Sequence, residues 1–220
     1  MDLTDCQLSK KGINFVLEGA ILNTSINYLN LSKNLIGIEN LNQVSKLIGK
    51  NQILRSFILD STAILFLDNF GFRESFMKTQ ISKLYLKNNN YNNSNHLSFL
   101  KDVMLLNLSI IQFNLKGNEI NEQGCPFLAS IIFGNNVLEI LNLNLNKINS
   151  EGAIILFNSL SRNKSIKILK LKSNLINMDA CYILMDFINE KSIRSEVILI
   201  DNKIDERTIF ELYPLIKIFN

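Results

Sequence analysis

The stretch LEILNLNLNKINSEGAIILFNSLSRNKS, residues 138–165, decides the fold. In its first half, leucine alternates with Asn142, Asn144 and Asn146, and this period-two spacing is typical of a strand with one buried face. After Gly152, apolar residues recur three and four positions apart, which indicates an amphipathic helix. The stretch therefore predicts a strand followed by a helix that packs against it.

The same pattern recurs along the chain with a period of about 28 residues. Apolar residues stand five and three positions before Asn146, and again two, ten and fourteen positions after it. Each unit cannot bury its apolar face alone, so the repeat indicates a stack of units. Alignment on Asn146 defines an anchor column of eight positions: Cys6, Asn34, Thr62, Asn89, Asn118, Asn146, Asn174 and Asn202.

The spacing L-x-x-L-x-L-x-x-[N/C]-x-L is the signature of leucine-rich repeats, and the chain resembles that family over its whole length. A glycine six positions after the anchor makes it similar to the ribonuclease-inhibitor-like subclass. The resemblance implies an α/β leucine-rich-repeat solenoid, a curved right-handed horseshoe with parallel strands on the concave face and helices on the convex face. We expect a single domain over 1–220, with seven to eight repeats at anchor positions 6, 34, 62, 89, 118, 146, 174 and 202.

Composition narrows the classes of function. The net charge of +3 is too mild to indicate a nucleic-acid partner. The N-terminus has no basic segment followed by an apolar run, and no apolar stretch reaches the roughly 18 residues that a membrane span needs. Cys6, Cys125 and Cys181 show no paired spacing, so we read them as free thiols in a reducing compartment. These features predict a cytoplasmic protein.

Asparagine is predicted to have three different roles. The anchor asparagines should turn inward, where an amide can satisfy backbone groups at the bend. Asn142 and Asn144 should point to the concave surface, without a structural role. Asparagine or threonine seventeen positions after the anchor should end each helix in the left-handed conformation. These residues are Asn23, Asn51, Thr79, Asn135 and Asn163.

No motif for catalysis is present. The single histidine, His96, lies seven positions after its anchor, in a column of mostly small or apolar residues, so we interpret it as partly buried and structural. With one histidine and three scattered cysteines, the chain offers too few ligands for a transition metal. We therefore expect no enzyme, no catalytic residue, no metal and no cofactor.

Two segments depart from the repeat. Phe66, Phe70, Phe72 and Phe76 crowd the third repeat, and we interpret them as irregular packing of an outer helix. An apolar contact on the convex side or rim is the alternative. The asparagine-rich segment 88–95 is predicted to be a mobile loop.

The concave face is the predicted binding site. Its free positions should lie one, two, four and six residues before each anchor. They carry lysines in the middle and later repeats, together with amides and two tyrosines of the kind enriched at interfaces. We predict that an acidic or polar protein partner binds here. The residues are Tyr28, Asn30, Lys83, Tyr85, Lys87, Asn114, Lys116, Asn142, Asn144, Lys170 and Lys172.

The leading interpretation is a non-enzymatic protein–protein interaction module, an adaptor or scaffold, whose partner the sequence does not identify. A bacterial effector would look the same. The resemblance also leaves open a regulator of a small GTPase, similar to Ran GTPase activators, or a cytoskeletal or axonemal component. At the C-terminus, residues 207–220 should fold back as a cap, with weak self-association through the strand edge at 196–201 as the alternative.

Overall fold

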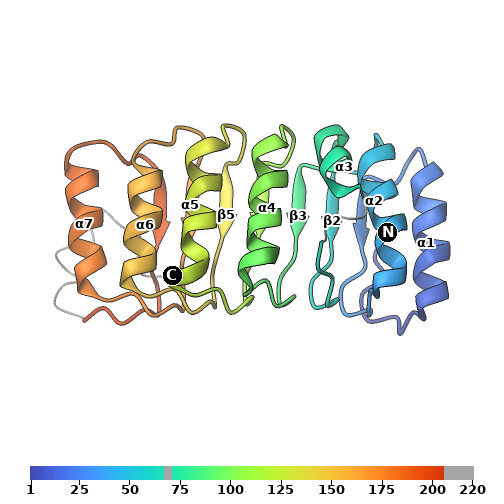
Figure 1. The fold of residues 1–220 in the computed structure, drawn as a ribbon, viewed down its shortest axis with the longest axis horizontal. Helices are drawn as coiled ribbons and strands as arrows, with labels where there is room; N and C mark the ends of the chain where they lie inside the picture. The colour runs from blue at the N-terminus through green and yellow to red at the C-terminus, as the bar shows by residue number, and fades with distance from the viewer. Residues whose placement is uncertain (67–70, 206–220) are drawn as a thin grey trace.

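The computed structural model describes residues 1–66 and 71–205, and within them seven helices alternate with seven short strands (Figure 1). The strands are β1 Tyr28–Asn30, β2 Ser56–Ile58, β3 Lys83–Tyr85, β4 Gln112–Asn114, β5 Ile140–Asn142, β6 Ile168–Lys170 and β7 Glu196–Ile198. The helices are α1 Lys10–Leu22, α2 Leu41–Lys50, α3 Phe72–Lys78, α4 Ser94–Leu106, α5 Cys125–Gly134, α6 Ser150–Leu160 and α7 Met178–Asn189. The short 3-10 turns η1 Ile38–Asn40 and η3 Glu122–Gly124 lead into α2 and α5.

The strands form one parallel sheet in chain order, and the register joins equivalent positions of successive repeats. Leu141, for example, lies opposite Phe113 on one side and Leu169 on the other. The helices form a single row along one face of the sheet (Figure 1). Strands pack about 4.8 Å apart and helices about 8–10 Å apart, so the sheet takes the inside of the arc. The predicted α/β horseshoe, a leucine-rich-repeat-like solenoid, is confirmed.

The core lies between the sheet and the helix row. From the second anchor, Asn34, onward, the residues five and three positions before the anchor point into it, and Leu141 and Leu143 are both fully buried. The apolar face of each helix closes the core from the other side, as Leu156 and Leu160 of α6 show. A continuous hydrophobic cluster runs from Ile13 to Leu199, so each repeat is stabilised by its neighbours.

The anchor asparagines form a buried ladder along one edge of the core. The Asn146 Oδ1 atom accepts hydrogen bonds from the backbone N–H groups of Asn118 (3.0 Å) and Ile120 (2.9 Å). Its Nδ2 atom donates to the carbonyls of Leu115 (3.1 Å) and Leu143 (2.9 Å). Each anchor therefore links two repeats, and the inward orientation predicted for this column is confirmed from Asn34 to Asn174, which are all buried.

Two anchor positions deviate. Cys6 is exposed, contrary to the prediction, because it belongs to the first coil at the edge of the sheet. Thr62 is buried, but the backbone N–H of Ile36 bonds to the Thr62 backbone carbonyl (3.0 Å), where other repeats use a side-chain amide. A threonine hydroxyl has a single proton, and that of Thr62 bonds to the Leu59 carbonyl (2.9 Å). A threonine at the anchor position therefore makes only some of the hydrogen bonds that an asparagine makes there.

A second ladder of asparagines runs along the C-terminal ends of the helices. The prediction that these residues end the helices in the left-handed conformation is wrong. Asn51 has φ −74° and ψ 119°, which is extended backbone, and Asn23 and Asn135 are similar. The Asn51 Nδ2 atom donates to the Ala20 carbonyl (2.7 Å) at the end of the preceding helix, while its Oδ1 atom accepts from the N–H of Leu54 (2.7 Å). The column satisfies helix-end carbonyls of the neighbouring repeat, and this role needs no left-handed residue.

Close approach explains the glycine six positions after the anchor. A Cβ atom on Gly152 would lie 2.7 Å from the Cys125 Sγ atom and 3.2 Å from the Glu122 Cα atom. In the first repeat, a Cβ atom on Gly12 would have no neighbour closer than 3.5 Å. Glycine at this position therefore lets the start of one helix pack onto the preceding repeat.

The two irregular segments are both part of the ordered core. Phe66, Phe72 and Phe76 are fully buried, and the ring centroids of Phe66 and Phe72 lie 4.9 Å apart, which confirms irregular core packing. Phe70 lies outside the described residues. The prediction of a mobile loop at 88–95 is wrong, because Asn89 and Tyr91 are buried and Asn93 caps α4 through a hydrogen bond to the Asn95 N–H (2.8 Å).

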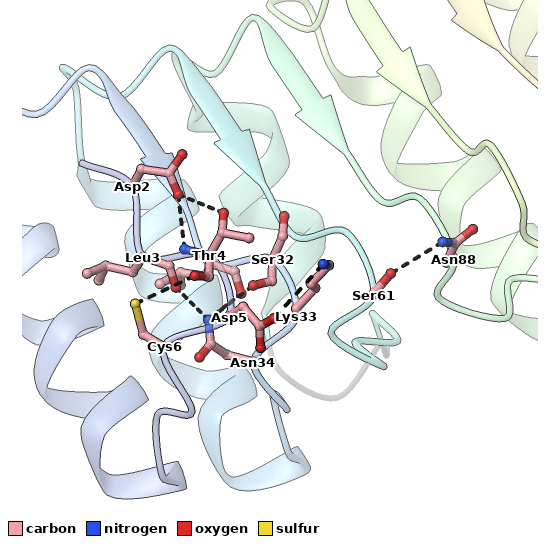
Figure 2. A network of polar contacts seen from close by, with 11 residues as sticks. Asp2, Leu3, Thr4, Asp5, Cys6, Ser32, Lys33, Asn34, Ser61 and Asn88 are labelled. Atoms are coloured by element: carbon pink, nitrogen blue, oxygen red, sulfur yellow. Dashed lines mark hydrogen bonds and ion pairs between the residues drawn. The ribbon is translucent and has the colours of Figure 1, made fainter.

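The N-terminal residues line the outer edge of β1 (Figure 2). The backbone N–H of Leu3 bonds to the Asn30 carbonyl (2.9 Å), and the Asn34 Nδ2 atom donates to the Leu3 carbonyl (2.8 Å). Asp2 accepts hydrogen bonds from the backbone and the hydroxyl of Thr4. At the other end, the predicted cap at 207–220 lies outside the described residues. The strand edge at 196–201 is described, with β7 as the last strand of the sheet, and weak self-association through it stays a prediction.

Candidate interaction surface on the concave face

The concave face is made of three rows of side chains that cross the sheet. Because the strands pair in register, the residues six, four and two positions before the anchors become neighbours across repeats. Tyr85, for example, pairs with Asn114, and Asn114 pairs with Asn142. All eleven residues predicted to bind a partner lie in these rows and are partly exposed.

The concave asparagines are not free of structural duty, contrary to the sequence-based expectation. The Asn142 Oδ1 atom accepts a hydrogen bond from the backbone N–H of Asn144 (3.0 Å), and the Asn144 Oδ1 atom accepts one from the N–H of Lys172 (2.8 Å). Asn30 and Asn114 make the same bond to the residue two positions later, at 3.0 Å each. These oxygens hold the strand ends in place. The Nδ2 groups of Asn114, Asn142 and Asn144 donate no hydrogen bond within the described residues and remain donors for a ligand.

The position just before each anchor is a backbone bend, and the prediction that it is a free concave position is wrong. Its residues have φ between 54° and 69° in every repeat from Lys33 to Asp201. Gly117 is the only glycine among them, with φ 69°. Most side chains in this column contact the bend of a neighbouring repeat. The Asn88 Nδ2 atom donates to the Ser61 Oγ atom at 3.3 Å (Figure 2).

Positive charge is concentrated in the middle of the face. Lys83, Lys87, Lys116 and Lys170 make no ion pair within 4.0 Å in the parts of the chain that the structure describes. Lys172 differs, because its Nζ atom lies 3.2 Å from the Asp201 Oδ2 atom. The four unpaired lysines have their charge available for an acidic partner.

Asp60 lies among these lysines. Its Oδ1 atom accepts a hydrogen bond from the Lys87 backbone N–H (2.8 Å). Burial raises the pKa of its carboxyl group, while that bond and the charges of Lys87 and Lys116 act in the opposite direction. One carboxylate thus interrupts the positive surface and limits where an acidic group of a partner can lie.

Tyr85 stands at the edge of a small pocket. The cavity has a volume of about 90 Å³ and is lined by Tyr85, Gln112, Asn114, Ile140, Asn142 and Lys170, with Phe113 at its base. The Tyr85 hydroxyl donates to the Gln112 Oε1 atom (3.1 Å), which fixes the ring, and burial raises the pKa of this hydroxyl. Gln112 and Ile140 were not predicted as binding residues. Gln112 and Ile140 line the same pocket as Tyr85 because the strands β3, β4 and β5 pair side by side.

The remaining conspicuous residues have structural surroundings. His96 lies in the first turn of α4, partly buried as predicted, and its ring packs against Tyr91 with centroids 6.3 Å apart. Burial lowers the pKa of this imidazole. Cys125 and Cys181 are buried free thiols, and burial raises the pKa of each to about 12. Among the described residues, no three acidic, histidine or cysteine side chains are grouped to hold a metal ion.

No protein-family model matches the chain, and no curated protein matches it. Among solved structures it is similar to leiomodin-1 actin-binding site 2 (ABS2), with a TM-score of 0.52 and 13% sequence identity. The match covers 68% of this chain and 90% of that chain. The likeness supports the solenoid fold. No helix in the described part of the chain is both long and apolar enough to cross a membrane.

Proposed function

We propose that the chain is a protein-interaction module that binds a protein partner through the concave face. The observation that carries this proposal is the set of four concave lysines without an ion pair among the described residues, one of which, Lys170, lines the pocket beside Tyr85. Hydrogen bonds from side chains to backbone hold the surface in one shape, and a preformed surface loses little conformational entropy on binding.

The chemistry of the face favours an acidic segment of the partner. Lysine charges steer such a segment to the face, and the free amide donors of Asn114 and Asn142 can bind carboxylate or carbonyl oxygens. An apolar or aromatic side chain could enter the pocket between Tyr85 and Ile140. Asp60 would repel acidic groups placed over the earlier strands, so the preferred position is over β3 to β6.

We further propose a non-enzymatic adaptor or scaffold of the cytoplasm, with no nucleic-acid partner and with repeats of the ribonuclease-inhibitor-like kind. The close approach at Gly152 and Gly124 supports the subclass, because each glycine begins a helix against the preceding repeat. The three free thiols favour a reducing compartment. His96 packs against an aromatic ring, which favours a structural role over catalysis.

A cytoskeletal partner is the second candidate. One solved structure with a similar fold, leiomodin-1 actin-binding site 2, is named as an actin-binding site, and this gives the cytoskeletal alternative a concrete ligand to test. At 13% identity the likeness concerns the fold, so actin should be tested by co-sedimentation with filaments. A small-GTPase regulator stays a third alternative, supported by the resemblance alone.

Affinity capture from cell lysate, followed by mass spectrometry, tests the proposal. The baits are the natural chain and a variant with Tyr85, Lys87, Lys116 and Lys172 changed to alanine. A matched control changes one tyrosine and three lysines on the helices, namely Tyr182, Lys11, Lys46 and Lys50. We expect a partner that is lost with the concave variant and kept with the control. Equal capture by all three baits would contradict the proposal, provided circular dichroism shows that all three are folded.

A further inference from the structure

A basic pocket lies away from the concave strands, where the last two described helices turn back into strands. It has a volume of about 530 Å³ and is formed by residues 161–167, between α6 and β6, and 191–195, between α7 and β7. Five cationic side chains line it: Arg162, Lys164, Lys167, Lys191 and Arg194. Among the residues that the structure describes, none that lines the pocket is acidic.

The cations are concentrated at this place. Lysine and arginine make up 23 of the 220 residues of the chain, but five of the twelve residues in these two connections. The connection of the preceding repeat, 135–139, carries no cation and ends in Glu139. A charge distribution that followed composition alone would spread cations over every repeat, so the pocket is a local feature of the last two.

Most of these charges are available for a ligand. The Lys167 Nζ atom pairs with the Glu139 Oε1 atom at 2.7 Å. The other four cations make no ion pair within the described residues. Four unpaired cations around one cavity repel one another, and a bound anion would relieve that repulsion.

The polar groups of the wall are already used by the protein. The Ser192 hydroxyl donates to the Phe187 carbonyl (2.8 Å) and the Ser195 hydroxyl to the Ile166 carbonyl (2.6 Å). The Asn163 amide donates to the carbonyl of Asn135 (3.1 Å) and accepts from the N–H of Ser165 (2.9 Å). The wall polar groups are therefore held in place, and a ligand would be bound by the exposed cationic side chains. This arrangement selects for negative charge.

We propose that this pocket binds a phosphorylated side chain of a protein partner. Two arginines offer forked donors that match a phosphate group, and the flanking lysines add charge. Glu139, which pairs with Lys167, would repel a polyanion that extended past this side of the pocket, and this favours a single phosphate group over a long polyanion. Within the described part of the chain, Ile166 is the one apolar residue that lines the pocket, and it is buried, so it offers no exposed anchor for a lipid bilayer.

Fluorescence polarisation with a short degenerate peptide library centred on phosphoserine tests this site. The variant combines Arg162→Gln with Arg194→Gln, and the control combines Lys11→Gln with Lys46→Gln, which removes the same charge elsewhere. We expect the phosphopeptides to bind the natural chain and the control alike. In the arginine variant their affinity should fall about tenfold or more, because charged hydrogen bonds are lost and each tenfold corresponds to about 1.4 kcal/mol.

Three results would overturn the proposal. They are equal binding of the unphosphorylated library, an equal loss in the lysine control, and binding only to vesicles that carry phosphatidylinositol phosphate. The concave variant described above should bind the phosphopeptides normally, because it shares no residue with this pocket. Failure of the concave proposal and failure of this one are thus separate results.

Discussion

Asn146 binds the backbone N–H of Asn118, one repeat away, at a distance of 3.0 Å. The same oxygen accepts from Ile120, and the same amide donates to carbonyls of two repeats. A single side chain thus satisfies polar groups that would otherwise be buried without partners. The ladder of such residues fixes the spacing of the repeats and with it the curvature of the concave face.

Asn146→Ala is expected to destabilise the fold by about 1–3 kcal/mol, because it leaves buried backbone groups unpaired. Asn142→Ala in the same repeat removes one hydrogen bond to a partly exposed N–H, and it should cost about 0.5–1.5 kcal/mol. Chemical denaturation of both variants measures the difference. Equal losses would show that the buried ladder has no special role.

Gly152→Ala should destabilise the protein by about 1–3 kcal/mol, since the new methyl group would overlap Cys125 and the backbone of Glu122. Gly12→Ala occupies the equivalent position in the first repeat, where space is available. It should stabilise α1 by up to about 1 kcal/mol, because alanine favours a helix over glycine. Thermal unfolding of the two variants measures whether each one is less or more stable than the natural chain. A stabilising Gly152→Ala would refute the close-approach explanation.

Leu145→Gly should leave stability unchanged or raise it by up to about 1 kcal/mol. Leu145 is half exposed and has φ 54°, a conformation that costs a non-glycine residue about 1–2 kcal/mol. Leu175 is also exposed, but its φ angle is not positive. Leu175→Gly should therefore lose about 0.5–1 kcal/mol from the greater freedom of the unfolded chain. Urea titrations of the two variants compare them, and a larger loss at Leu145 would contradict the backbone argument.

The raised pKa of Asp60 predicts a pH-dependent effect. A carboxyl group whose pKa is higher in the folded state binds protons more tightly there, so its contribution to stability falls as pH rises from about 3.9, the ordinary pKa, through the folded-state pKa. Asp60→Asn keeps an oxygen for the Lys87 N–H and does not titrate. The variant should gain stability relative to the natural chain as pH rises through that window. A gain that is the same at every pH would argue against the raised pKa.

Much of the fold could be predicted from the sequence because each buried column repeats a residue type. The Leu143 column carries leucine in all eight repeats and the Asn146 column carries asparagine in six, because most repeats place each column in a site of the same shape and polarity. The left-handed bend carries no such signal, since Lys33, Ser61 and Leu145 have nothing in common except backbone conformation. The bend is set by the hydrogen bonds on both sides of it, which only the structure shows.

The candidate sites were also predicted only in part: the direction of a side chain follows from the sequence, but its neighbours across the sheet do not. Alternation along a strand placed Tyr85 and Lys87 on the concave face correctly, because side chains in a strand point alternately to two sides. Their neighbours across the sheet depend on register, so the pocket between Tyr85 and Ile140 was not predicted. The basic pocket joins Arg162 to Arg194 across two repeats, and no local pattern links them. The hydrogen bond from the Lys172 N–H to the Asn144 Oδ1 atom, which joins neighbouring repeats, was missed for the same reason.

Site-specific photo-crosslinking tests the central claim most directly. The photoreactive residue p-benzoylphenylalanine would replace Tyr85 in the concave pocket, and in a second protein it would replace Phe133, which is exposed on the convex helix α5. After irradiation in lysate, we predict that the partner found by affinity capture is crosslinked from position 85 and not from position 133. Crosslinks to that partner from position 133 alone would contradict binding through the concave face.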